Sequence, residues 1–167
     1  MTSRLRLFVL AVVFATCLGF DQATKGLAAL VLRGAPAFSF CGDALRLQYV
    51  VNAGAFLGLG SALPAWERQA LLTGAAGGVL LALAAFLVVR RELKVQDFLG
   101  YALILSGGAS NLLDRAVRGE VVDFLNVGLG PVRSGIFNLA DLAITTGLAL
   151  VLAAHLLRRS REGRDIR

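Results

Sequence analysis

The chain has 167 residues, of which 57% are apolar and 17% charged, and its mean hydropathy is +0.73. A soluble domain has about 45–50% apolar and about 25% charged residues. The composition therefore excludes an ordinary soluble enzyme, a disordered chain and a nucleic-acid-binding module, although the formal net charge is +6. Two cysteines and one histidine also argue against a disulfide framework or a zinc site. We expect one integral membrane domain, residues 1–167.

Four segments are apolar enough to cross a membrane, whose hydrocarbon core of roughly 30 Å takes about 20 helical residues. These predicted spans cover residues 7–32, 69–89, 98–113 and 136–157. The near-alternating run 45–50 is a strand candidate in the linking segment 33–68, and residues 114–135 form another linking segment. The sequence therefore predicts an all-α membrane protein: four transmembrane helices, with a small β-strand region and loops on the non-cytoplasmic face.

The basic residues predict the orientation of these spans. One side would carry ten of the 17 Lys and Arg residues and four of the 11 Asp and Glu residues, and the other side seven of each. Because cytoplasmic loops are enriched in Lys and Arg, both termini should be cytoplasmic. A cleavable signal peptide is an alternative for the basic start and the apolar run 7–20. The apolar pattern resumes after Lys25, which favours a retained span.

Polar residues converge near the outer face in this topology. They lie at the end of the first span, the end of the third span, the start of the fourth span and in the loop between the last two: Asp21, Lys25, Asn111, Asp114, Arg115, Asn138, Asp141 and Asp123. Ionisable groups in a span are costly and usually functional. The alternative is structural, with pairs such as Asp21–Lys25 or Asp114–Arg115 closing helix ends. We favour that alternative for Asp21 and Lys25.

Carboxylate chemistry is the enzymatic option that these residues support. Two neighbouring carboxylates cannot both ionise cheaply, so such a pair can act as general base and general acid on a water molecule. That chemistry needs neither metal nor cofactor. Cys41 has no histidine partner, and the serines of the third span have no base. Asp123 and Asp141 have no neighbouring cation in sequence, which argues against a purely structural role for the whole set of polar residues.

Two other classes of function stay open on these residues. A small transporter would use intramembrane carboxylates to bind or relay ions, but the inner halves of the four spans are almost purely apolar. A membrane scaffold could associate through Gly74 and Gly78, a small-xxx-small pair for which we expect helix packing. The run Asn52–Ala55 has a plain turn as its simplest interpretation.

Five blocks of sequence nevertheless resemble those of the lipoprotein signal peptidase, or signal peptidase II, family of membrane aspartyl proteases. In chain order they are Asp21-Gln22-Ala23-Thr24-Lys25, Asn52-Ala53-Gly54-Ala55-Phe56, Gly107-Gly108-Ala109-Ser110-Asn111-Leu112-Leu113-Asp114-Arg115, Val121-Val122-Asp123-Phe124 and Phe137-Asn138-Leu139-Ala140-Asp141. Their order and spacing match the family across nearly the whole chain. The first block alone is weak, and the last three together are highly specific.

The resemblance implies a membrane-embedded aspartic endopeptidase that cleaves a prolipoprotein before its diacylglyceryl-modified cysteine. The expected partners are that substrate and membrane lipids, with globomycin as inhibitor. The implied catalytic residues are Asp123 and Asp141. The implied supporting and substrate-binding residues are Asn52, Gly54, Asn111, Asp114, Arg115, Asn138, Asp21 and Lys25.

Two departures from the family pattern stand out. Phe56 comes one residue early in the second block, which puts the contacts of Ala55 and Phe56 in doubt. Ser110 replaces a glycine in the third block. Because a small residue is retained there, we expect little effect.

Overall fold

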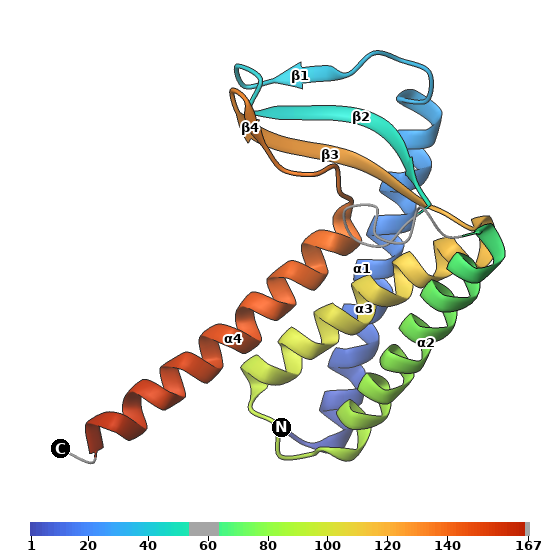
Figure 1. Cartoon of the computed structure of the whole chain (residues 1–167). Helices are drawn as coiled ribbons and strands as arrows, with labels where there is room; N and C mark the ends of the chain where they lie inside the picture. The colour runs from blue at the N-terminus through green and yellow to red at the C-terminus, as the bar shows by residue number, and fades with distance from the viewer. Residues whose placement is uncertain (54–63, 166–167) are drawn as a thin grey trace.

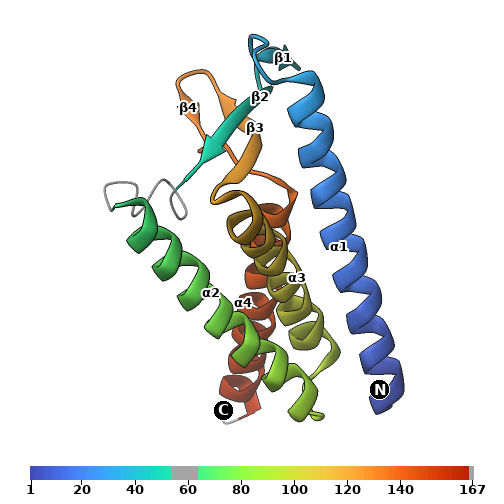
Figure 2. The same ribbon diagram turned by 90° about the vertical axis from the view of Figure 1, so that its right-hand side faces the viewer.

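A helical bundle carries a small sheet at one end in the computed structural model, which describes residues 1–53 and 64–165 (Figure 1). In that part of the chain the elements are α1 (Ser3–Val31), β1 (Phe38–Phe40), β2 (Leu45–Asn52), α2 (Ala65–Val89), α3 (Val95–Arg118), β3 (Val121–Leu129), β4 (Val132–Arg133) and α4 (Leu139–Asp165). The start of α1 and the end of α4 both lie at the end of the bundle remote from the sheet (Figure 2). The mostly helical fold with a small strand region is as predicted.

The central helix of the bundle is α3, which packs against α4, α1 and α2. Its polar residues, such as Asn111 and Asp114, are buried because neighbouring helices cover them. The helix continues to Arg118 and ends where Gly119 adopts a left-handed backbone with φ 77°, a conformation that glycine adopts without steric penalty. The linking segment predicted to begin at residue 114 therefore begins later.

The sheet is antiparallel throughout, in the order β1-β2-β3-β4. The predicted strand 45–50 is present and extends to Asn52. Asp123 lies in β3, opposite Val50 of β2, so the prediction that it lies in a loop is wrong. The physical reason is the apolar run around it: Val121, Val122 and Phe124 are buried, and the strand pairing satisfies their backbone.

The helix α4 begins later than residue 136, where the sequence predicted the fourth span to begin. Phe137 forms a bridge with Leu125, and each residue donates its backbone N–H to the carbonyl of the other at 2.8 Å. The chain is thus held against β3 up to Phe137, and the helix begins two residues later, at Leu139. This bridge places the first turn of α4 beside the strand that carries Asp123.

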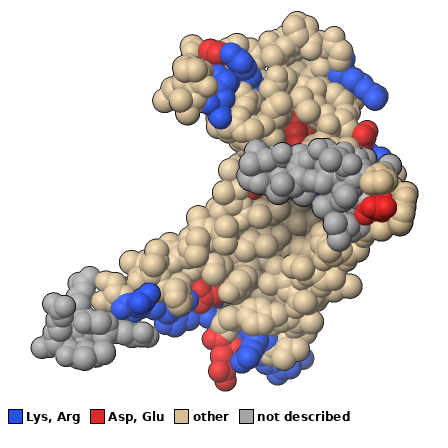
Figure 3. Space-filling model, in the orientation of Figure 1, with Lys and Arg blue, Asp and Glu red and all other residues tan. Residues whose placement is uncertain are grey.

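The surface of the bundle is that of a membrane protein. Charged side chains gather at the sheet and at the opposite end, and the sides of the helices between them are uncharged (Figure 3). Large apolar residues such as Phe8, Leu30 and Leu81 are exposed there, which is rare in a protein that faces water. Two segments, Ser3–Val31 and Leu139–Ser160, are long and apolar enough to cross a membrane; α2 holds a shorter apolar stretch, Thr73–Val89.

The glycines that let helices approach each other are not the predicted pair. A Cβ atom added to Gly74 or Gly78 would meet nothing within 4 Å in the described part of the chain. A Cβ atom on Gly107 would instead collide with the carbonyl of Ala140, and one on Gly147 with the carbonyl of Gly100. Close packing therefore occurs between α3 and α4, and within the described residues no neighbour packs against Gly74 or Gly78, so the helix packing expected of this pair is not seen inside the chain.

Candidate active site

Asn138 precedes the first turn of α4 and caps it. Its side-chain oxygen accepts the backbone N–H of Asp141 at 3.0 Å, and the Asp141 carboxylate accepts the backbone N–H of Asn138 at 3.2 Å. This reciprocal pair is a capping box, which satisfies N–H groups that a helix start leaves unpaired. The spacing of asparagine and aspartate, three residues apart, therefore fixes where the Asp141 carboxylate lies.

The same asparagine side chain also binds the second aspartate. Its amide donates to Asp123 Oδ1 at 2.7 Å and, more weakly, to the carbonyl of Val122 at 3.3 Å. The other carboxylate oxygen of Asp123 accepts the amide of Asn52 at 3.1 Å. Asn52 lies diagonally across the β2–β3 pair from Asp123, because its direct partner is Val121, and diagonal neighbours on one face of a sheet reach each other through their side chains.

Asn111 on α3 completes the connection. Its amide donates to Asp141 Oδ1 at 2.9 Å, and its oxygen accepts the amide of Asn138 at 3.2 Å. Three asparagines thus hold the two carboxylates in one cluster: Asn52 from β2, Asn111 from α3 and Asn138 from just before α4. The carboxylates themselves come from β3 and from the first turn of α4. The cluster can place one water molecule and one carbonyl group between a proton donor and a proton acceptor.

The electrostatics differ between the two aspartates. Asp123 is 3% exposed among apolar neighbours, and this burial raises the pKa of its carboxyl to about 6, with a further increase from the charge of Asp141. Asp141 is only half buried. Its carboxylate accepts a backbone N–H at the positive end of α4, a position that stabilises negative charge.

A buried ionic network lies behind this cluster. The Lys25 ammonium of α1 contacts Asp21 Oδ2 at 2.6 Å, Asp114 Oδ2 at 2.7 Å and Asn111 Oδ1 at 2.8 Å. Asp21 in turn accepts the backbone N–H of Ala140, in the first turn of α4, at 2.8 Å. The Asp21–Lys25 pair that we interpreted as structural does form, but it does more than close a helix end, because it joins α1 to both α3 and α4.

Some members of this network are absent from the predicted site residues. Ser110 is fully buried and donates to Asp21 at 2.7 Å, and Gln22 donates to Ser110 and to Asp114, each at 3.0 Å. The hydroxyl of Ser110 therefore takes part in the network, a contact that a glycine at this position could not make, while the expectation of little effect stays a prediction. Arg118, one turn after Asp114, pairs with it at 2.8 Å. The sequence does contain a signal for these three residues. Gln22 and Ser110 are adjacent to predicted site residues, and Arg118 lies one helical turn after Asp114.

The remaining predicted residues have different outcomes. The guanidinium of Arg115 is half buried near the cluster, where it is attracted by the charges of Asp141 and Asp123. It also lies 3.4 Å from the carbonyl of Asn111. Gly54, like the early Phe56, lies outside the described residues. The structure thus connects eight of the ten predicted site residues through the hydrogen bonds and ion pairs between side chains described above: Asp21, Lys25, Asn52, Asn111, Asp114, Asp123, Asn138 and Asp141.

Comparisons with known proteins show the family to which this chain is similar. The model of the signal peptidase (SPase) II family matches residues 13–157. A lipoprotein signal peptidase of Burkholderia multivorans is 40% identical over 119 residues, covering 71% of this chain and 70% of the relative. One of Chlorobium phaeobacteroides is 33% identical over 143 residues, covering 81% of this chain and 82% of the relative.

Solved structures share the fold. One bacterial membrane enzyme superposes with a TM-score of 0.79 at 25% identity, covering 92% of this chain and 90% of that one. A second bacterial membrane enzyme gives a TM-score of 0.75 at 26% identity, covering 89% of this chain and 92% of that one. The similarity therefore extends over the bundle and the sheet together.

Proposed function

This chain belongs to the signal peptidase II family of proteases, and we propose that Asp123 and Asp141 are its catalytic pair. The enzyme removes the signal peptide from prolipoproteins, as its relatives' name states. Cleavage takes place before the cysteine that carries diacylglycerol. The observation that carries the assignment is that Asn138 binds both carboxylates, through Asp123 Oδ1 and through the Asp141 capping box.

The two carboxylates have different roles in this proposal. Asp141 is the base, because it is half exposed and receives a backbone N–H at the start of a helix, which favours the ionised form. Asp123 holds the proton, because it is buried between apolar residues. The environments therefore separate two chemically identical groups, as a general acid and a general base require.

The reaction then proceeds in two steps. Asp141 takes a proton from a water molecule while the water oxygen bonds to the scissile carbonyl carbon, and Asp123 hydrogen-bonds and protonates the carbonyl oxygen. In the second step the C–N bond breaks, the proton held by Asp141 passes to the leaving amine, and the hydroxyl proton returns to Asp123 as the carbonyl re-forms. The supporting roles belong to Asn52, Asn111 and Asn138, which hold the carboxylates, and to Arg115, which attracts them.

We also propose a membrane arrangement, which the fold supports. All four helices span a bacterial inner membrane with both termini in the cytoplasm, and the sheet lies on the non-cytoplasmic face. The uncharged belt between two charged ends supports this placement (Figure 3). The cluster of carboxylates lies where the bundle meets the sheet, so a lipid-modified cysteine can stay in the bilayer while its peptide bond reaches the aspartates.

Purified protein and a diacylglyceryl-modified precursor test the catalytic assignment. Asp123→Asn and Asp141→Asn should each lower the cleavage rate by about 100-fold or more, the usual contribution of a general acid or base. Glu120→Gln is the matched control, because Glu120 is an exposed acid three residues from Asp123. Globomycin should block the wild type and the control. Normal cleavage by either folded aspartate variant would remove the proposed mechanism.

A further inference from the structure

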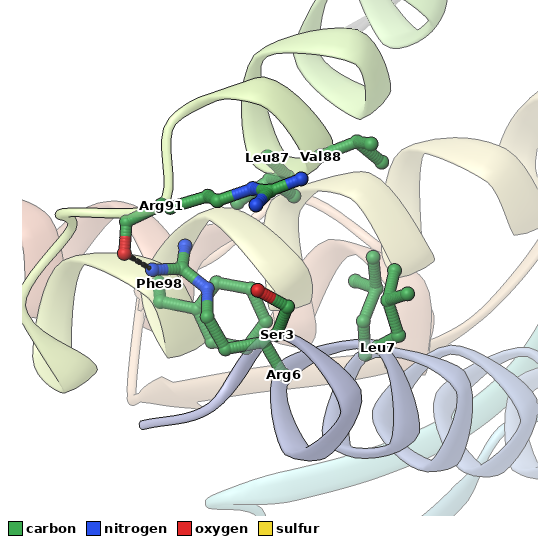
Figure 4. A pocket seen from close by; sticks show the side chains of 8 residues that line it. Ser3, Arg6, Leu7, Leu87, Val88, Arg91 and Phe98 are labelled. Carbon is green, nitrogen blue, oxygen red and sulfur yellow. Dashed lines mark hydrogen bonds between the residues drawn. The ribbon is translucent and has the colours of Figure 1, made fainter.

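A hollow of about 70 Å³ lies between α1 and α2 at the end of the bundle remote from the carboxylates (Figure 4). Its walls are apolar and come from Leu7 and Leu10 of α1 and from Leu87 and Val88 of α2. Two arginines, Arg6 and Arg91, line it as well. The hollow therefore combines an apolar surface with two positively charged groups.

Arg6 has a structural task at this hollow. Its buried guanidinium donates to the backbone carbonyls of Arg90, at 2.9 Å, and of Arg91. It also lies over the ring of Phe98, 4.6 Å from the ring centre, a cation–π distance. These carbonyls belong to the end of α2, where the helix dipole is negative. Arg6 therefore joins α1 to the end of α2 and forms a fixed part of the hollow.

Arg91 has no such task. Its side chain is exposed and makes no hydrogen bond or ion pair within residues 1–53 and 64–165. Figure 4 shows the side chain of Arg91 extending toward Leu87 and Val88, so that its charge lies beside the apolar walls. Leu7 and Val88, each 54% exposed, continue these walls onto the outer surface of the bundle.

The surrounding charge favours an anion. Arg4, Arg90 and Lys94 lie near these residues in sequence, and Glu92, between Arg91 and Lys94, forms no ion pair within the described residues. The other acid of this region, Asp97, is paired with Arg158 of α4 at 2.7 Å. A cationic group above an apolar surface matches a phospholipid, whose phosphate is joined to acyl chains, and basic pockets between membrane helices on the cytoplasmic side bind anionic head groups.

We propose that this hollow binds one anionic phospholipid of the cytoplasmic leaflet. The phosphate contacts Arg91, and an acyl chain enters between Leu10 and Leu87 and continues along Leu7 and Val88. A hollow of about 70 Å³ is too small to enclose a phospholipid, so most of the molecule lies on the surface of the two helices. The inference rests on the proposed topology and is independent of the catalytic assignment.

Native mass spectrometry of the detergent-purified protein tests the proposal. Dioleoyl phosphatidylglycerol should be retained as a single molecule, and dioleoyl phosphatidylcholine, which has the same chains and no net charge, should be retained much less. Arg91→Gln should weaken phosphatidylglycerol binding about fivefold, the effect of one basic residue at an anionic lipid surface. The matched control is Arg159→Gln, which removes an exposed arginine at the same end but on α4 and should bind as the wild type does.

A second variant tests the hollow rather than the charge. Val88→Trp fills the space between the helices while Arg91 stays, and it should also weaken phosphatidylglycerol binding. Inorganic phosphate at the same concentration should not compete. Equal retention of the two lipids, or an equal loss in Arg91→Gln and Arg159→Gln, would overturn the proposal. Cleavage of precursor should persist in all three variants, so a failure of lipid binding is distinguishable from a failure of the catalytic assignment.

Discussion

Asn138 forms hydrogen bonds with both aspartates of the proposed catalytic pair. Its side-chain N–H donates to Asp123, and its side-chain oxygen accepts the backbone N–H of Asp141. An asparagine can do both because it carries a donor and an acceptor on one short side chain. Hydrogen bonds to a carboxylate favour its ionised form, and burial opposes them, so small changes in donors should shift the protonation of the pair.

The pH dependence of cleavage follows from that balance. Burial raises the pKa of Asp123 to about 6, so its proton is present below that pH and is lost as the pH rises through it. Since kcat/KM reports the free enzyme, we expect it to fall above about pH 6. Asn52→Ala removes a donor that stabilises the ionised form of Asp123, and the alkaline limb should move to higher pH. An unmoved limb in a folded Asn52→Ala enzyme would contradict this role for the hydrogen bond.

Lys25 is a buried cation that depends on its carboxylate partners. Its ammonium group is fully buried and compensates the charges of Asp21 and Asp114. Removal of one partner from a buried ion pair costs about 3–5 kcal/mol, because a buried charge is left uncompensated. Lys25→Met should therefore lower the thermal midpoint of the detergent-purified protein strongly or prevent its recovery.

Arg118 supplies the matched comparison for that prediction. It binds the same Asp114, but its side chain is 47% exposed, and exposed pairs contribute about 0–1 kcal/mol. Arg118→Gln should leave the thermal midpoint nearly unchanged. If Arg118→Gln and Lys25→Met had equal effects, burial would not be what makes Lys25 important.

At the scale of the elements, the approach of α3 to α4 positions the catalytic cluster. Gly107 faces the carbonyl of Ala140, the residue before Asp141, and Gly147 faces the carbonyl of Gly100 further along the pair. The absence of side chains lets the two backbones meet at both points. The depth at which α4 begins against α3 is therefore set by glycines, and the capping box then orients Asp141 from that start.

A single methyl group should disturb this geometry. Gly107→Ala pushes against a backbone carbonyl that cannot rotate away, and overpacking of this kind costs about 1–3 kcal/mol. We expect a lower thermal midpoint together with slower cleavage. Gly78→Ala, where the added methyl group meets nothing within 4 Å in the described chain, should retain both. Loss of activity in Gly78→Ala alone would reverse the assignment of the close contact.

At the scale of the whole molecule, charge is sorted along the axis of the bundle. On the face that Figure 3 shows, basic and acidic side chains lie at the sheet and at the opposite end of the bundle, and the stretch between them is uncharged. Positively charged loops stay in the cytoplasm during insertion. In the proposed topology the active site then faces outward, and the inner end carries the basic residues that border the proposed lipid site.

Cysteine labelling tests this orientation. Cys41, next to β1 at the sheet end, is exposed, and a membrane-impermeant maleimide should label it in right-side-out vesicles. A probe at the other end is obtained with Cys41→Ser plus Arg159→Cys, which should react in inverted vesicles. Labelling of both positions from the same side would exclude the proposed topology.

The sequence by itself determined the elements and their chemistry. Hydropathy located four helices, alternation located β2, and the five motif blocks identified the family, while the catalytic role that they imply for Asp123 and Asp141 stays a prediction. These features are local, because a span or a capping box needs only residues adjacent in the chain. Where local signals competed with pairing between distant segments, the predictions failed: Asp123 is in a strand that β2 completes, and α4 starts late because Phe137 binds Leu125.

Only the tertiary structure decided which polar residues meet. The contacts of Lys25 with Asp114 and Asn111 join residues 86 to 89 positions apart in the chain, and no spacing rule predicts such pairs. The same holds for Ser110 with Asp21 and for Asn52 with Asp123. The physical reason is burial: in a region without water each polar group must find a partner, and the packing of α1, α3, α4 and the sheet decides which partner is within reach.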